Sequence, residues 1–262
     1  MEEKMQKTKD MKPEDMLFTY KGVLYPSLLC KPENFKAMER FEAREDDILL
    51  VAYPKCGFNW MSHVLKKISD AAHVKRGETA LFTFLEFTDP EKLQVLVIFR
   101  NPKDTAVSYF HFYNKNPALP TFDSWDKFFS QYMSGEVMLG SYFDHAVAWE
   151  KHIDSDTVKI ITYEDMIENL TEGIQQVAKF FSLTLSDEQV QAIAQESTFE
   201  TMKNKSKETH GQMGNVIFRK GGVGDWKNHF SEEQSKELDA KFEQCLAGTK
   251  IGAKFKYEVH CK

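Results

Sequence analysis

The sequence predicts an α/β protein in which a central parallel sheet is covered by helices on both faces. Three short and mostly apolar runs, residues 48–52, 95–99 and 158–163, have the length and composition of buried strands. Polar turn residues follow each run, and apolar residues at helical spacing follow the turns. Strands that alternate with helices in this way favour the α/β class.

Length and composition favour a globular protein with free thiols. The chain has 262 residues, enough for one large domain or two small ones, and 42% of them are hydrophobic. The net charge of −6 includes no basic block, so we expect no nucleic-acid partner. Four scattered cysteines without a C-x-x-C pair favour a cytoplasmic protein with neither a disulfide framework nor a metal site.

The N-terminal part lacks the marks of a membrane or secretory segment. The first ten residues are charged throughout, and no apolar run approaches the roughly 20 residues that span a membrane. We therefore expect a flexible tail over residues 1–17 and no membrane partner. Residues 18–26 predict a hairpin that turns at Lys21-Gly22, and residues 32–44 predict a short helix.

The remaining elements follow in order. Helical spacing begins at Trp60, and residues 71–94 have no clear period. After the strand at 95–99, Pro102 and Asp104 suit the first turn of a helix. Further helices are predicted over residues 125–133, 142–152, 170–181 and 187–195. A short helix is capped near Ser197, residues 203–215 predict a mobile polar loop, and Ser231 opens the last helix with a capping box.

The first strand leads into a turn with the composition of an anion cradle. Pro54 and Gly57 break the strand, and the next helix starts near Trp60. A helix N-terminus attracts anions, Gly57 lets the backbone approach a ligand, and Lys55 adds a full charge. The order of lysine and glycine differs from the triphosphate loop G-x-x-x-x-G-K-[ST]. Plain architecture remains the alternative interpretation of this turn.

Three side chains occupy equivalent positions in the predicted sheet. Lys55, Arg100 and Tyr163 each follow a strand, and ligands of parallel sheets bind at the carboxyl ends of the strands. A second cationic pair, Arg219-Lys220, lies in a glycine-rich stretch. Two separated cationic positions would suit a ligand with phosphates at two places. The alternatives are incidental turn residues and a solvated surface loop.

Four motifs together resemble the cytosolic sulfotransferases, and within this group they most resemble family 6B. The motifs are YPKCGFNW at residues 53–60, FRNPKDTAVSYFHF at 99–112, YEDM at 163–166 and RKGGVGDWK at 219–227. The resemblance runs from about Phe18 to the C-terminus. It implies one domain over residues 18–262 with a P-loop-like, three-layer α/β/α fold, and 3′-phosphoadenosine 5′-phosphosulfate (PAPS) as the sulfo donor.

The resemblance also implies a role for each matching residue. The 5′-phosphosulfate would be held by Lys55, Cys56, Gly57, Phe58, Asn59 and Trp60. The 3′-phosphate would be held by Arg100, Ser108, Arg219, Lys220 and Gly221. The adenine pocket would be shaped by Trp60, Tyr163, Thr198, Phe199 and Met202, with Ser197 nearby. Lys55 and Ser108 would take part in catalysis, and Lys55 would stabilise the charge that develops on the leaving phosphate.

The sequence departs from the family where a catalytic histidine is expected. Only 34 residues separate Trp60 from Val95, and no Thr-His pair occurs between them. We therefore expect the sheet to be one strand short and the usual general base to be missing. His63, His73 and His111 are candidate substitutes for this base. Structural roles are favoured for His63 and His111 and a solvent-exposed position for His73, so none is assigned the role.

Two smaller departures concern the phosphate turn and the dimer contact. Phe58-Asn59 stands where many relatives have two hydroxyl residues. A homodimer is possible, but the usual Lys-x-x-x-Thr-Val dimer pattern is absent after Trp226.

The sequence therefore predicts sulfo transfer to a hydroxyl or amine of a small acceptor. The open alternatives are a nucleotide-binding protein without turnover, a kinase-like phosphoryl transferase, and a chain that folds poorly because a strand is missing.

Overall fold

The computed structural model describes residues 11–38, 47–72 and 94–262. Three parallel strands form its central sheet in the order β3-β4-β5: β3 (Ile48–Ala52), β4 (Gln94–Phe99) and β5 (Val158–Thr162). The register pairs Leu50 with Leu96 and Val97 with Ile160. Within the described ranges β3 pairs on one side only, which is consistent with the expectation of a sheet that is one strand short.

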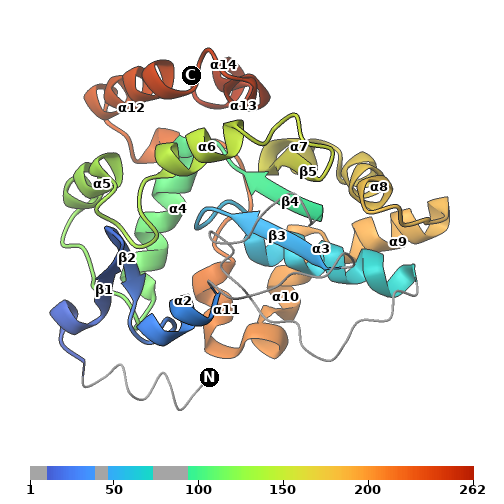
Figure 1. The fold of residues 1–262 in the computed structure, drawn as a ribbon, viewed down its shortest axis with the longest axis horizontal. Coiled ribbons are helices and arrows are strands. Elements are labelled where there is room, and N and C mark those ends of the chain that lie inside the picture. The colour runs from blue at the N-terminus through green and yellow to red at the C-terminus, as the bar shows by residue number, and fades with distance from the viewer. Residues whose placement is uncertain (1–10, 39–46, 73–93) are drawn as a thin grey trace.

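Two separate cores show that helices cover both faces of this sheet. Val95, Val97 and Phe99 point from β4 into a core with α4 (Pro102–Lys115), α5 (Trp125–Ser134) and α6 (Tyr142–Glu150). Leu96 and Ile98 point to the opposite core, which contains α3 (Phe58–Ala71), α8 (Leu170–Phe180) and α9 (Asp187–Glu196). Since side chains of a strand alternate between faces, β4 is buried on both sides. The predicted three-layer α/β/α class is confirmed (Figure 1).

The outer elements surround these layers. An antiparallel hairpin of β1 (Leu17–Tyr20) and β2 (Val23–Pro26) turns at Lys21-Gly22, as predicted. Helix α2 (Pro32–Met38) follows, and the rest of the helix predicted up to residue 44 lies outside the described residues. The other helices are α7 (Tyr163–Glu168), α12 (Glu232–Cys245), α13 (Lys250–Lys254) and α14 (Tyr257–His260).

The C-terminal helices are attached to α4 by a buried lysine. Lys103 is 1% exposed, and its ammonium group lies 2.7 Å from a carboxylate oxygen of Asp239 on α12. The same group donates to the Cys261 carbonyl at 2.7 Å and lies 4.3 Å from the centroid of the Trp226 ring. A buried lysine with an ionic partner, a carbonyl and an aromatic face is compensated for its lost hydration. This cluster fixes the segment after the glycine-rich stretch against α4.

The prediction of a mobile loop over residues 203–215 is wrong. The chain there continues as helix α10 (Phe199–His210), a 3-10 turn (Gly211–Met213) and the short helix α11 (Gly214–Ile217). Only Met202 and Ser206 of α10 are buried, so the apolar period that signals a helix is too weak to be recognised. Thr198 caps α10 by accepting a hydrogen bond from the backbone N–H of Thr201.

Candidate active site

One large cavity lies at the carboxyl ends of the strands. Its volume is about 1400 Å³, and it is lined by residues from β3, α3, α6, α10 and the glycine-rich stretch. All but two of the predicted site residues line it: Lys55, Gly57, Phe58, Asn59, Trp60, Arg100, Ser108, Tyr163, Thr198, Phe199, Met202, Arg219, Lys220 and Gly221. The other two, Cys56 and Ser197, are fully buried behind the cavity wall. The topology therefore brings distant motifs to one place, as ligand sites of parallel sheets require.

The turn between β3 and α3 is shaped by two residues with positive φ. Lys55 has φ of 69° although it is not a glycine, and Gly57 has φ of 103°. A Cβ atom at Gly57 would lie 2.9 Å from Cδ2 of Tyr163. The close approach of the turn to the tyrosine ring therefore requires glycine. Helix α3 begins directly after Gly57, so its positive end lies beside Lys55.

Lys55 occupies a desolvated position next to other cations. Its Nζ atom lies 4.5 Å from the centroid of the Phe112 ring, within cation–π distance. Burial, followed by the charges of Arg100 and Arg219, lowers the pKa of Lys55 to about 7. The free site is therefore short of negative charge, and an anion bound here would favour the protonated form of Lys55.

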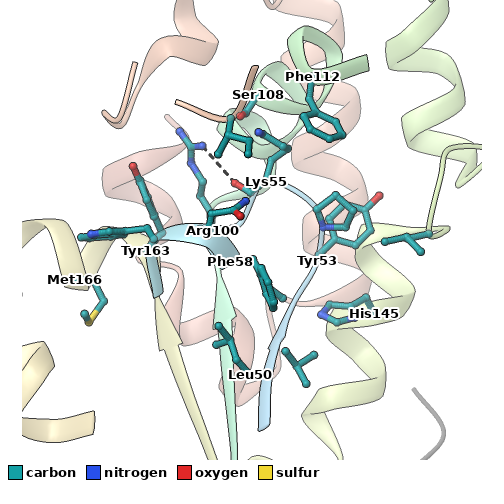
Figure 2. A pocket seen from close by; sticks show the side chains of 18 of the residues that line it. Leu50, Tyr53, Lys55, Phe58, Arg100, Ser108, Phe112, His145, Tyr163 and Met166 are labelled. Carbon is teal, nitrogen blue, oxygen red and sulfur yellow. Dashed lines mark hydrogen bonds between the residues drawn. The ribbon is translucent and has the colours of Figure 1, made fainter. Parts of the chain in front are cut away.

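Arg100 connects the Lys55 turn to the glycine-rich stretch. Its guanidinium donates to the Gly222 carbonyl at 2.9 Å and to the Lys55 carbonyl at 3.5 Å, the bond drawn in Figure 2. It also lies 4.7 Å from the centroid of the Tyr163 ring. Among the described residues, the buried Nε atoms of Arg100 and Arg219 have no hydrogen-bond partner. Two orphaned guanidinium donors at one cavity are the groups that a bound phosphate would satisfy.

A buried carboxylate fixes the two cationic segments relative to each other. Asp104 is 1% exposed and accepts backbone N–H bonds from Gly224 at 2.7 Å and from Trp226 at 3.0 Å. The backbone N–H of Asp104 in turn donates to the side chain of Asn101, which caps α4. Glu164 accepts from the backbone and side chain of Asn101 at 2.9 and 2.8 Å. Segments that follow β4 and β5 are thus joined to the glycine-rich stretch.

The glycine-rich stretch holds its own cations around one acid. Asp225 forms ion pairs with both Arg219 and Lys220, and its pKa lies well below the usual range because hydrogen bonds from these cations and from Asn228 outweigh its burial. A Cβ atom at Gly221 would lie 2.0 Å from the Phe199 ring, so the absence of a side chain there lets the stretch pack on α10.

An aromatic pair forms the wall between α3 and α7. Trp60 and Tyr163 are in edge contact, with ring centroids 5.1 Å apart, and the Trp60 indole donates to the Ser197 carbonyl at 2.7 Å. Ser197 therefore acts from outside the cavity, through its backbone. Cys56 likewise lies behind the wall, where its thiol is 3.6 Å from the Thr105 hydroxyl and burial raises its pKa to about 12. Such a thiol is neutral and unreactive.

Two of the three candidate substitute bases lie in the described part of the chain, and neither lines the cavity. His63 lies on α3 and His111 on α4, where the His111 ring contacts His229 at a centroid distance of 5.1 Å. Burial, followed by the charge of Arg219, lowers the pKa of His111 to about 4. His73 lies outside the described residues.

The sequence motifs missed the apolar half of the cavity. There Met138 and Leu139 join residues of α6, notably His145 and Trp149. The spacing of His145 and Trp149 places both on one face of α6, which is the signal that could have identified them.

Fold and site together define an α/β nucleotide-binding protein in which separate cationic groups converge on one cavity. Comparisons with known proteins identify the family. The chain matches the family described as Sulfotransferase domain over residues 85–250. It is 47% identical to Sulfotransferase 6B1 of Pan troglodytes, covering all of this chain and 96% of that protein, and 47% identical to Sulfotransferase 6B1 of Danio rerio, covering 99% of that protein. The chain therefore belongs to the sulfotransferase family.

Solved structures agree with this assignment. The crystal structure of mouse sulfotransferase SULT7A1 complexed with PAP superposes with a TM-score of 0.82 at 31% identity, covering 93% of this chain and 99% of that one. Retinol dehydratase, solved with androsterone and PAP, has a TM-score of 0.72 at 18% identity and covers 95% of this chain, which supports the fold alone.

The alignment lengths bear on the expected gap. The alignment with the Pan troglodytes relative runs over 292 residues, whereas this chain has 262, so 30 aligned positions have no residue here. This shortfall is consistent with a missing internal segment.

Proposed function

We propose that the protein transfers a sulfo group from PAPS to the hydroxyl or amine of a small acceptor in the cytoplasm. The observation that carries the proposal is the convergence of Lys55, Arg100 and Arg219 on one cavity. One phosphate would not require all three cations, whereas PAPS carries anionic groups at its 5′ and 3′ positions. The orphaned Nε atoms of the two arginines fit such a ligand.

Each group of residues would hold one part of the nucleotide. Lys55 and the turn of Gly57, Phe58 and Asn59 would hold the 5′ end, where PAPS supplies the activated sulfo group. Arg100, Ser108, Arg219, Lys220 and Gly221 would hold the 3′-phosphate. Trp60, Tyr163, Thr198, Phe199 and Met202 would enclose the adenine, with Cys56 and Ser197 supporting the wall from behind.

Lys55 supplies the main electrostatic contribution to the reaction. Lys55 is partly buried and desolvated, and an ammonium group in such a position stabilises negative charge more than it would in bulk water. Charge moves onto the leaving phosphate as the bond to sulfur lengthens, so Lys55 binds the transition state more tightly than the ground state. Ser108 lies on α4 at the same cavity and would hold the nucleotide in register.

The setting of the protein also belongs to this proposal. Cys56, Cys245 and Cys261 are free thiols, as is usual in the reducing cytoplasm. No described helix has the length and apolarity needed to span a bilayer. Phe230, in the segment where a dimer motif is missing, packs internally against Trp125 and Phe129 at centroid distances of 5.1 and 5.4 Å. We therefore propose no dimer through that segment.

The test uses ³⁵S-labelled PAPS with a panel of phenols, steroids, alcohols and amines. We expect labelled product with at least one acceptor. We also expect calorimetry to detect binding of PAP (3′,5′-adenosine bisphosphate), the product that remains when PAPS has lost its sulfo group. Binding of PAP without transfer to any acceptor would contradict the enzyme and support a nucleotide-binding protein. Absence of both would overturn the proposed site as well.

A further inference from the structure

We propose that His145 is the general base of this sulfotransferase and replaces the histidine of the absent Thr-His motif. The inference rests on the proposed function, because it assigns the proton acceptor of the same reaction. Transfer to a hydroxyl or amine releases one proton, and a positioned imidazole is suited to accept it.

Burial and position single out His145 among the described histidines. Four of them, His63, His111, His145 and His260, have a buried Nε2 atom without a hydrogen-bond partner in the described part of the chain. Of these four, His145 is the one that lines the cavity with Lys55. A buried polar atom without a partner is costly and is found where a ligand completes the bonding.

Helix α6 places the ring close to the Lys55 turn. Ser141 caps this helix, and His145 lies in its first turn. The imidazole centroid is 5.9 Å from the Tyr53 ring and 5.3 Å from the Phe99 ring. Tyr53 precedes Lys55 by two residues and is anchored by a 2.7 Å hydrogen bond to the Gly140 carbonyl. The histidine therefore packs against the residue that lies two positions before Lys55.

The two sides of the Lys55 turn have different partners. Figure 2 shows Arg100 and Tyr163 on one side of this turn, and His145 with Tyr53 on the other. Arg100 and Tyr163 belong to the part of the cavity that would hold PAPS, called the nucleotide half below. A nucleotide bound there leaves the side of His145 free for the acceptor. An acceptor in the apolar half would meet the sulfo group between Lys55 and His145.

The protonation state agrees with this role. Burial lowers the pKa of His145 to about 4, so the ring is neutral and able to accept a proton at pH 7. No charged side chain contributes to that shift in the free protein. The anionic donor would raise the pKa by Coulombic attraction and bring the base closer to the working pH.

The proposed step balances. The acceptor oxygen or nitrogen forms a bond to sulfur while the bond from sulfur to the bridging phosphate oxygen breaks. The electron pair of the broken bond stays on the phosphate, where Lys55 compensates the charge. His145 Nε2 takes the acceptor proton, which leaves to solvent after the products dissociate.

The experiment compares His145→Gln with His63→Gln, because both rings have a buried Nε2 atom without a partner in the described part of the chain, and of the two only His145 lines the cavity. We expect H145Q to lower kcat roughly 10²–10⁴-fold, the usual range for loss of a general base, and to remove the acidic limb of the pH–rate profile, where protonation of the base slows the reaction. PAP binding by calorimetry and the thermal melt should stay close to wild type. Added imidazole should partly restore turnover in His145→Gly, and H63Q should keep kcat within threefold.

Three results would overturn the inference while the proposed function stands: near-normal turnover by H145Q, equal losses in both variants, or a loss of PAP affinity that matches the loss of kcat. Failure of the wild-type protein to transfer sulfate to any acceptor would defeat the proposed function, and this inference with it.

Discussion

The nucleotide half of the cavity and its apolar half are built in different ways. In the nucleotide half, side chains are held by hydrogen bonds between segments far apart in sequence, such as Arg100 to Gly222 and Asp104 to Gly224. In the apolar half, rings of Tyr53, Phe99 and His145 pack against each other. Directional bonds fix distances and charges, whereas packing fixes only volume and shape. The nucleotide half is therefore suited to one ligand, whereas the apolar half can adjust its shape to different acceptors.

The largest effect expected in the nucleotide half is loss of the charge of Lys55. Lys55→Met keeps the aliphatic stem against Phe112 and removes the ammonium group. We expect kcat to fall roughly 10²–10³-fold, the usual cost of losing one preorganised electrostatic contact at the transition state. Initial rates with saturating PAPS and acceptor measure this. Lys220→Met is the matched comparison, because Lys220 is 55% exposed and should cost about tenfold or less. Equal losses would show that Lys55 has no special position.

The next effect tests whether the nucleotide half depends on its hydrogen bonds. Asp104 accepts backbone N–H bonds from Gly224 and Trp226 with its two carboxylate oxygens. In Asp104→Asn one of these oxygens becomes an NH₂ group, so one of the two backbone donors loses its acceptor. An unsatisfied buried donor costs about 1–3 kcal/mol, so we expect PAP affinity to fall about 10–100-fold. Calorimetry measures the affinity, and the thermal melt separates it from global unfolding.

The control for this variant is Asp187→Asn, an exposed acid in the first turn of α9. It should change neither PAP affinity nor the melt appreciably. If D104N lowers the melting temperature but leaves PAP affinity intact, Asp104 supports the fold only, and the comparison between the halves fails.

Most of the fold could be predicted from the sequence because its elements carry local patterns. The three strands are short apolar runs, and α12 begins at Ser231 with the capping box that the sequence shows. The continuation of helix α10 beyond Met202 was missed because its outer face is polar and exposed, so tertiary contacts rather than its own period hold it in place. Family membership is confirmed by relatives that match the whole chain.

The site could be predicted only on the side where motifs exist. Lys55, Arg100 and Tyr163 follow strands, and this topology places them at one edge of the sheet. Their roles toward PAPS stay a prediction. The residues of the apolar half follow from no motif, because the packing of α6 against β3 and β4 is a tertiary outcome. Asp104 was noted only as a helix-start residue, since its contacts with Gly224 and Trp226 span about 120 positions.

A smaller effect is expected in the apolar half. Trp149→Ala removes a half-buried ring from the cavity wall. Loss of apolar contact worth about 1–1.5 kcal/mol should raise the KM of bulky apolar acceptors about tenfold. PAP affinity should not change, because Trp149 belongs to the other half. Steady-state kinetics with a large and a small acceptor measure this, and Val147→Ala, on the exposed face of α6, is the control. A parallel loss of PAP affinity would show that the halves are not independent.

The smallest expected effect is the pH dependence of PAP affinity, which depends on Lys55 in the nucleotide half. Burial, with Arg100 and Arg219 nearby, lowers the pKa of Lys55 to about 7, so the free protein loses this proton as the pH rises from 6 to 8. A bound anion favours the protonated form, so above pH 7 binding must take up a proton, and PAP affinity should fall about fivefold between pH 7 and pH 8. Calorimetry in buffers with different ionisation enthalpies counts that proton directly. Lys55→Arg keeps its charge throughout this range and should bind PAP with a flatter pH dependence. If both proteins show the same slope, Lys55 does not titrate in the site, and the proton belongs to the ligand.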